Sequence, residues 1–244
     1  MRHKETLLNT RPKSSSSSFL DQKMPDIDLI GDNHILTSYE TPMREDAFEK
    51  NDSQKKQIIE FHFRKIMETL GLDLSDDSLN GTPKRVAKMY VEEIFSGLDP
   101  KNKPAISLFE NKYQYNEMLV EKNISFYSNC EHHFVPIIGK AHVAYISNGN
   151  VIGLSKINRI VNYFAQRPQV QERLTNQIAD ELAKILDTDD IAVLVDAKHL
   201  CVSSRGIKDN SSSTITSYYG GKFKKKDIKK EFLNLSLNCN HDHI

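Results

Sequence analysis

Cys130-Glu131-His132-His133 is the stretch around which this sequence is organised. It holds one thiol, one carboxylate and two imidazoles, and a second stretch with similar ligand chemistry, His199-Leu200-Cys201, follows far downstream. Thiolate and imidazole are the ligand types that zinc prefers, so we expect Cys130, His133 and Cys201 to bind a zinc ion. Three protein ligands leave a fourth position open, which is typical of catalytic rather than structural zinc sites.

Two further histidines, His132 and His199, stand beside these candidate ligands. Imidazole titrates near neutral pH, so both side chains could transfer protons close to an open metal position. A closed, structural zinc site is the alternative interpretation, with His132 or His199 as its fourth ligand. A chain of this length with several amphipathic segments does not need a metal in order to fold, which favours the catalytic interpretation.

The composition of the chain bears on its class and its partners. Its 244 residues allow one sizeable domain with appendages or two small domains. Lysine plus arginine and aspartate plus glutamate both number 33, so the net charge gives no reason to expect a nucleic-acid partner. Three cysteines do not make a disulfide framework, and no apolar run approaches the ~20 residues needed to span a bilayer. We therefore expect a soluble, cytoplasmic protein without a membrane partner.

The distribution of apolar residues divides the chain into four parts. Residues 1–50 are polar and serine-rich, and we expect a disordered tail because they bury too little apolar surface to offset chain entropy. Residues 51–100 form a helical segment and residues 101–236 the catalytic domain. Residues 237–244 form a second disordered tail, where nothing would hold the cysteine and histidines of 239–243 in a ligand geometry.

Two helices are predicted within residues 51–100. The first has an apolar stripe that should face the core, formed by Ile59, Phe63, Ile66 and Leu70. It ends at Gly71. The second begins at Thr82-Pro83, with Thr82 as N-cap and Pro83 at the first helical position, and ends near Gly97.

Strand and helix patterns alternate after residue 100. Residues 141–147, 191–195 and 214–219 are predicted strands. Ser155 is predicted to cap one helix, a second helix follows Pro168, and residues 222–230 are expected to be a solvated basic run. A strand starting at about His199 should place His199, Cys201 and Arg205 on one face, because side chains alternate along a strand.

The first turns of the two predicted helices carry groups that suit a nucleotide. Lys156 and Arg159 lie near a helix N-terminus, whose free N–H groups already favour an anion such as phosphate. Gln171 and Glu172 can donate to and accept from a polar planar base. With a zinc-activated water nearby, these groups predict hydrolysis of a nucleotide.

Several long motifs resemble those of the GTP cyclohydrolase I family. Residues 130–134 (CEHHF) resemble its zinc motif. The other matching stretches are residues 82–90, 153–159, 166–174, 199–202 and 205–207. The resemblance runs from about residue 55 to Leu235, and neither terminus matches the family pattern.

This resemblance implies a fold, an activity and an assembly. The fold is the tunnelling fold, an α+β fold in which an antiparallel sheet is backed by helices, here with an N-terminal helical segment. The activity is hydrolysis of GTP to formate and 7,8-dihydroneopterin triphosphate, the first step toward tetrahydrofolate and tetrahydrobiopterin. The assembly is a homodecameric ring with its active sites at subunit interfaces.

The resemblance also implies a role for each site residue. Cys130, His133 and Cys201 would bind Zn²⁺, which activates the water that attacks carbon 8 of the guanine. His199 would protonate the neighbouring ring nitrogen, and His132 would assist ring opening. The implied GTP contacts are Gln171 and Glu172 at the guanine edge, Ser155 near the ribose and phosphates, and Lys156, Arg159, Arg205, Arg85 and Lys88 at the triphosphate.

Two other functions stay open at this point. The same cysteines and histidines could hold a structural zinc in a non-catalytic scaffold or in a regulatory subunit. A related pterin or deazaguanine enzyme of the same fold is a further possibility. Those relatives lack the full Cys, His, Cys set, so this sequence argues against that assignment.

Overall fold

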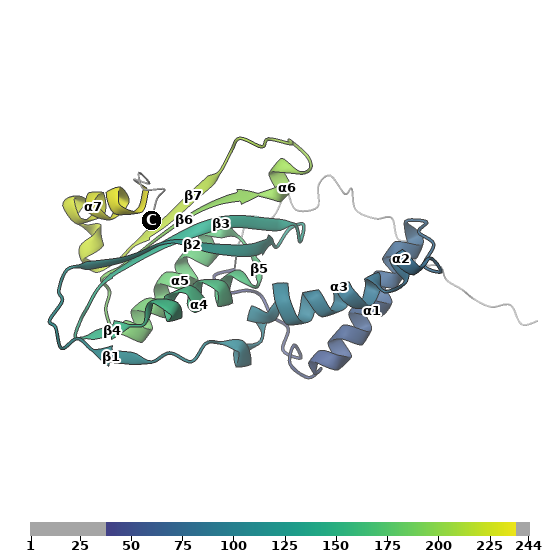
Figure 1. The fold of residues 1–244 in the computed structure, drawn as a ribbon, viewed down its shortest axis with the longest axis horizontal. Helices are drawn as coiled ribbons and strands as arrows, with labels where there is room; N and C mark the ends of the chain where they lie inside the picture. The colour runs from purple at the N-terminus through teal and green to yellow at the C-terminus, as the bar shows by residue number, and fades with distance from the viewer. Residues whose placement is uncertain (1–37, 238–244) are drawn as a thin grey trace, which may run out of the picture. The chain divides into compact units, whose positions relative to one another are not determined.

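A five-stranded sheet forms the centre of the protein (Figure 1). The structure, a computed structural model, describes residues 38–237. The sheet has the order β5-β2-β3-β6-β7 and consists of β2 (Met118–Cys130), β3 (Pro136–Ile146), β5 (Pro168–Gln169), β6 (Ile191–His199) and β7 (Thr214–Tyr219). All pairs are antiparallel except the short parallel pair of β2 with β5. The predicted α+β class is confirmed.

Two long helices cover one face of this sheet (Figure 1). They are α4 (Leu154–Ala165) and α5 (Gln171–Leu186). The predicted helix stripes are confirmed at Ile157, Ile160, Leu174 and Ile178, which are at most 1% exposed. These side chains pack against alternate residues of the strands, such as Val143 of β3, because a strand sends every second side chain to the same face.

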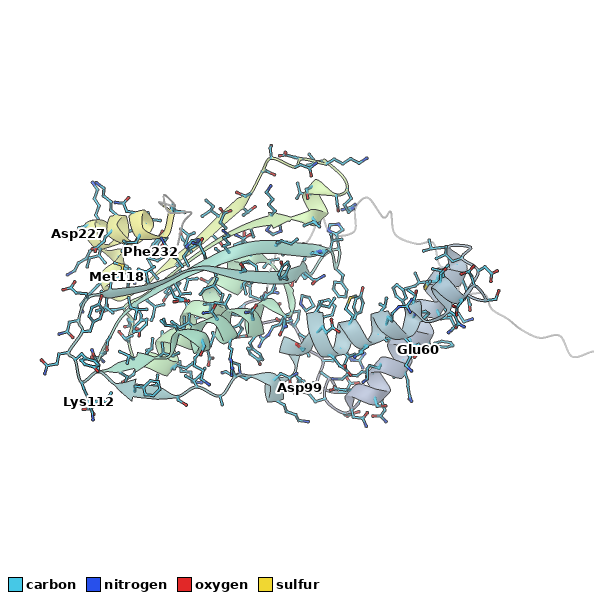
Figure 2. All side chains as sticks on the ribbon, viewed as in Figure 1. Glu60, Asp99, Lys112, Met118, Asp227 and Phe232 are labelled. Atoms are coloured by element: carbon cyan, nitrogen blue, oxygen red, sulfur yellow. The ribbon has the colours of Figure 1, made fainter. Side chains whose placement is uncertain are left out.

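The helix α7 (Lys226–Leu237) covers part of the opposite face. Its Phe232, labelled in Figure 2, is fully buried. It packs with Phe223, Ala144 and Leu194 in one apolar cluster. The expectation of a solvated basic run over residues 222–230 is confirmed for most of its lysines, which are exposed, but it is wrong for Phe223, which is buried. The lysines are the outer face of a turn and a helix, and Phe223 fixes that segment to the sheet.

The segment before the sheet is helical, as predicted, but less buried than expected. It contains α1 (Asp52–Thr69), α2 (Asp77–Asn80) and α3 (Thr82–Met89), followed by a π turn over Tyr90–Ile94 and short 3₁₀ turns over Ser96–Leu98 and Pro100–Asn102. The stripe predicted to face the core leaves Ile66 52% and Leu70 72% exposed. Within α1 only Met67 is buried, although the helix packs against α3.

The predicted helix starts need two corrections. The N-cap of α3 is Gly81, and the Thr82 hydroxyl instead accepts a hydrogen bond from Arg85 at 2.9 Å. The N-cap of α4 is Gly153, whose extended backbone precedes Leu154, so Ser155 lies in the first turn and does not cap the helix. Helix ends are commonly displaced by one or two residues from pattern-based predictions.

A separate two-stranded ladder joins the loop before the sheet to the start of α4. It pairs β1 (Leu108–Glu110) with β4 (Asn150–Ile152) in antiparallel register. The turn predicted before β4 is confirmed, and Gly149 has φ +93, a conformation that favours glycine. Among residues 38–237, no helix is long and apolar enough to cross a membrane.

Residues 38–50 lie in the part of the chain that was predicted to be a tail. Ser38 and Glu40 nevertheless make hydrogen bonds to α5. Residues 1–37 and 238–244, including Cys239 and its neighbouring histidines, lie outside the described residues. The predicted domain boundaries stay predictions.

His142 should make the folded protein sensitive to acid. Its side chain is 4% exposed on the α7 face of the sheet, and its Nδ1 has no hydrogen-bond partner among the described residues. Burial lowers its pKa, with Asp196 opposing that shift. The unfolded chain therefore binds the proton more tightly, and stability is lost as pH falls below the ordinary histidine value of about 6.5.

We therefore expect His142→Leu to reduce the loss of stability between about pH 7.5 and about pH 5.5, measured by urea unfolding. His62→Leu is the matched control, because His62 lies exposed on α1. An unchanged pH dependence in His142→Leu would contradict the assignment.

Candidate metal centre and active site

The two ligand stretches meet because they lie at the same end of adjacent strands. Strand β2 ends at Cys130 and β3 begins at Pro136, so residues 131–135 form the turn between them. The end of β6 is paired with the start of β3, with His199 opposite Ile137. This register brings residues that are far apart in sequence to one edge of the sheet.

The turn after β2 is held by its own backbone. The Cys130 N–H donates to the Val135 carbonyl at 2.9 Å, and the Phe134 N–H donates to the Cys130 carbonyl at 2.8 Å. Phe134 adopts φ 52, a left-handed conformation that tightens the turn. His132 and His133 therefore stand at an exposed tip beside the buried Cys130.

The side chains of Cys130, His133 and Cys201 converge on one point. One ligand atom from each lies within 4.8 Å of the other two. In a tetrahedral zinc site the donor atoms lie roughly 3.3–3.8 Å apart, so small side-chain rotations would close the set around an ion. His133 is exposed and Cys201 half-buried, which leaves one side of the cluster open. The donor chemistry and the open side fit a zinc ion with a vacant fourth position.

Cys201 reaches the cluster by a different route from the one predicted. The strand expected to run from His199 to Arg205 stops at His199, and Leu200–Ser203 form the short helix α6. The Ser204 N–H donates to the Leu200 carbonyl at 2.8 Å, which turns the backbone and ends the alternation. Burial and the nearby Cys130 thiol raise the pKa of Cys201. A bound dication favours the thiolate and reverses that shift.

His199 is held by a buried amide. Its Nε2 lies 2.7 Å from the Gln171 Oε1, while the Gln171 Nε2 donates to the carbonyls of Val195 and Thr214 at 3.1 and 2.8 Å. These two donations fix the orientation of the amide, so the Nε2 of His199 must carry the proton. Burial lowers the pKa of His199, opposed by the nearby Glu172 carboxylate. Burial therefore favours the neutral form of the imidazole.

Comparison with known proteins identifies the family. Residues 59–237 match the sequence profile described as GTP cyclohydrolase I. A protein named GTP cyclohydrolase 1 from Flavobacterium johnsoniae is 61% identical over 208 residues, which cover 85% of this chain and 93% of that protein. Proteins of the same name from Aeromonas salmonicida and Citrobacter koseri are 57% and 52% identical, over 80% and 84% of this chain and 88% and 93% of theirs.

The chain belongs to the GTP cyclohydrolase I family. The resemblance found in its motifs is confirmed, and its fold is the tunnelling fold of that family. The match begins within α1 and ends at the last residue of α7, so it includes the candidate metal centre and the helices on both faces of the sheet.

Some of the other site residues that the GTP cyclohydrolase I resemblance implied lie close to the candidate metal centre. Arg205 donates to the Nε2 of His133 at 2.8 Å. The Nδ1 of His132 lies 3.6 Å from the Cys130 sulfur. Glu172 is near enough to His199 to affect its pKa. Gln171 is hydrogen-bonded to His199 and to two backbone carbonyls. Its implied contact with guanine stays a prediction.

The remaining candidates lie elsewhere. The contacts described within residues 38–237 do not link them to the metal ligands. Lys156 donates to the Ala105 carbonyl at 3.0 Å, while Ser155 and Arg159 stand exposed on α4. Arg85 and Lys88 line a basic hollow between α1 and α3, together with Lys56 and Lys84.

Sequence reasoning missed two residues next to this centre. Glu131 and Arg173 form an ion pair at 2.5 Å, and the Arg173 side chain is 3% exposed. Both lie within motifs of the GTP cyclohydrolase I family, but nothing in their spacing of 42 residues indicates that they pair. A buried arginine next to a metal-ligand turn is visible only in the structure.

Zinc retention should separate ligands from proton carriers. Cys201→Ala should lower the zinc content from about one ion per chain to near zero, because only two protein ligands remain. His199→Ala should keep the ion, because His199 is bound to Gln171 and is not needed as a ligand. The zinc of each purified protein is measured by inductively coupled plasma mass spectrometry. Loss of zinc from His199→Ala would instead indicate a closed, four-ligand site.

Proposed function

We propose that this chain is a zinc-dependent GTP cyclohydrolase I that hydrolyses GTP to formate and 7,8-dihydroneopterin triphosphate. The observation that carries this proposal is the convergence of Cys130, His133 and Cys201, close in the chain to a His199 that Gln171 holds in place, in a protein of this family. Its product would supply tetrahydrofolate or tetrahydrobiopterin synthesis, and its place of action would be the cytoplasm.

The zinc ligands, His199 and His132 would have different roles in this reaction. Zinc held by the two cysteines and His133 would supply a water ionised near neutral pH and a Lewis acid. Gln171 orients the imidazole of His199 through Nε2, which leaves Nδ1 to take up a proton and return it to a ring nitrogen. His132 stands exposed beside the ligands, where it can move a second proton during ring opening.

Binding of GTP would use residues on several elements. Gln171 and Glu172 would contact the guanine edge, and Ser155 the ribose and phosphates. The cations Lys156, Arg159, Arg205, Arg85 and Lys88 would hold the triphosphate. Arg205 already lies beside His133, which supports a phosphate near the metal centre.

A homodecameric ring is part of this proposal. The phosphate-binding candidates on α3 and α4 are not linked to the metal ligands by contacts described within one chain. An interface would bring the missing cations to each site from another copy. The exposed apolar side chains of α1, among them Phe61, Ile66 and Leu70, support burial against such a copy.

GTP turnover tests the activity. The zinc-loaded protein given GTP should release one formate per GTP and a product that becomes a fluorescent pterin on oxidation. His199→Ala should lower kcat by about 10²–10⁴-fold while retaining zinc, because general acid–base catalysis is lost. Zinc-loaded wild-type protein that releases neither formate nor pterin would rule out the proposed activity.

The ring should depend on the apolar face of α1. Native mass spectrometry should detect ten chains in the wild-type assembly, and the double variant Ile66→Glu/Leu70→Glu should dissociate it because two charges would be buried unpaired. Tyr113→Glu is the matched control, since Tyr113 is 97% exposed. A ring that survives the double variant would show that α1 lies outside the interface.

A further inference from the structure

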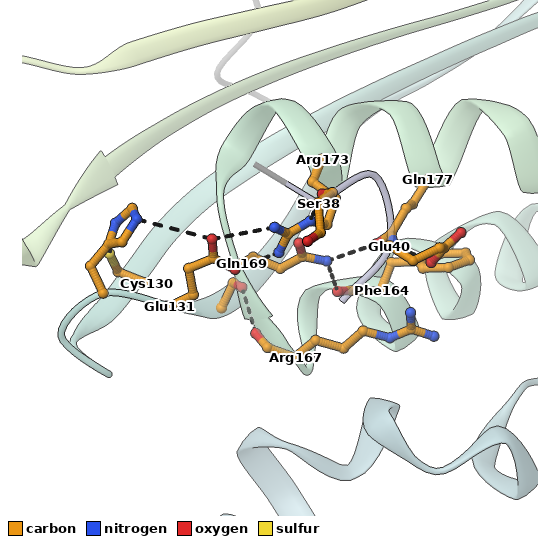
Figure 3. A network of polar contacts seen from close by, with 11 residues as sticks. Ser38, Glu40, Cys130, Glu131, Phe164, Arg167, Gln169, Arg173 and Gln177 are labelled. Atoms are coloured by element: carbon orange, nitrogen blue, oxygen red, sulfur yellow. Dashed lines mark hydrogen bonds and ion pairs between the residues drawn. The ribbon is translucent and has the colours of Figure 1, made fainter. Parts of the chain in front are cut away.

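The turn that carries the metal ligands is tied to the residues at the start of the described chain. Figure 3 shows a polar network that begins at Cys130 and Glu131 and crosses the N-terminal half of α5. It ends at Ser38 and Glu40. Two separate routes of hydrogen bonds join these ends.

The first route starts from the Glu131 side chain. Its carboxylate binds Arg173 through both oxygens, at 2.5 and 3.3 Å. The Nε of Arg173 donates to the Ser38 carbonyl at 2.8 Å. Arg173 is therefore paired on both sides while almost wholly buried. Moving the Glu131 carboxylate away would leave the Arg173 charge buried without its partner, so the pair resists displacement.

The second route starts from the Glu131 backbone. Its N–H donates to the Gln169 carbonyl at 3.0 Å, next to the parallel pairing of Cys130 with Gln169. The Gln169 side chain donates to the Gln177 Oε1 at 2.9 Å, and the Gln177 Nε2 donates to Glu40 at 2.7 Å. Gln169 and Gln177 are at most 3% exposed, so water does not compete for these bonds.

The two routes end at Ser38 and Glu40, and the residue between them makes a third bond to α5. The Tyr39 hydroxyl donates to Asp180, and this bond raises the pKa of Tyr39 to about 12. Ser38-Tyr39-Glu40 thus form a short strap across α5. Both routes run from this strap to the residue that precedes His132 and His133.

We propose that Glu131 and Arg173 are positioning residues for the metal-ligand turn, and that the strap at residues 38–40 holds Arg173 in place. Glu131 faces Arg173 and not the ligand cluster, and its Oε1 lies 4.0 Å from the His132 Nε2. The pair therefore fixes the turn on which Cys130, His132 and His133 stand. The catalytic part of this inference rests on the proposed function, but its effect on metal retention does not.

The ion pair is tested with three variants of the full-length protein. Arg173→Met leaves Glu131 partly buried without its partner and is expected to lower both stability and activity. Glu131→Gln/Arg173→Met removes both charges and should recover the thermal stability of the wild type. Arg173→Lys keeps the positive charge but loses the bidentate contact with Glu131. Its stability and activity should therefore lie between those of the wild type and of Arg173→Met.

The double variant distinguishes positioning from mere support of the fold. It should keep kcat at least about tenfold below the wild type, change the KM for GTP by less than about threefold, and release zinc to a chelating dye at least about tenfold faster. Recovery of kcat and zinc retention together with stability would overturn the proposal. If wild-type protein does not turn over GTP, the proposed function fails while zinc release still tests the positioning role.

The strap is tested separately, with a matched pair of variants in the same segment. Glu40→Ala removes the acceptor of Gln177, whereas Glu45 is an exposed carboxylate nearby. Glu40→Ala should lower kcat and speed zinc release about threefold or more, and Glu45→Ala should match the wild type. Equal behaviour of the two variants would show that the strap does not act on the turn.

Discussion

The register between β3 and β6 is the constraint on which the candidate site depends. His199 is paired opposite Ile137, at the end of the sheet where the turn after β2 begins. A shift of one residue would move the buried side chains of the shifted strand to the other face of the sheet, so the buried side chains along the strands fix the register. Val143, Val193 and Val195 face α4 and α5, while Ala144 and Leu194 face α7. The packing of the sheet thereby determines where the ligands meet.

Much of the site could be predicted because its chemistry is local in sequence. Cys130 and His133 are three residues apart, and His199 and Cys201 are two apart, so each half of the site is visible as a motif. That the two halves meet was predicted correctly, but for a partly wrong reason. Side-chain alternation along a strand does not explain how Cys201 reaches the other ligands, because β6 ends at His199 and Cys201 lies in the short helix α6.

The parts that could not be predicted depend on contacts between distant segments. The pairing of Glu131 with Arg173 and the strap at residues 38–40 leave no periodic pattern in the sequence. The helix α7 was missed because Phe223 and Phe232 stand within a lysine-rich stretch, where composition alone indicates solvent exposure. The opposite error occurred in α1, whose apolar stripe was expected in the core, although Ile66 and Leu70 are exposed in one chain.

We propose that three protein side chains hold zinc and leave its fourth position open. X-ray absorption spectroscopy of the zinc-loaded protein measures this directly, because sulfur ligands at ~2.3 Å and imidazole ligands at ~2.0 Å give separate signals. We expect the zinc shell to contain two sulfurs, one imidazole nitrogen and one light atom from solvent. A second imidazole in the zinc shell would contradict it, because His132 or His199 would then be a ligand and the site would be closed.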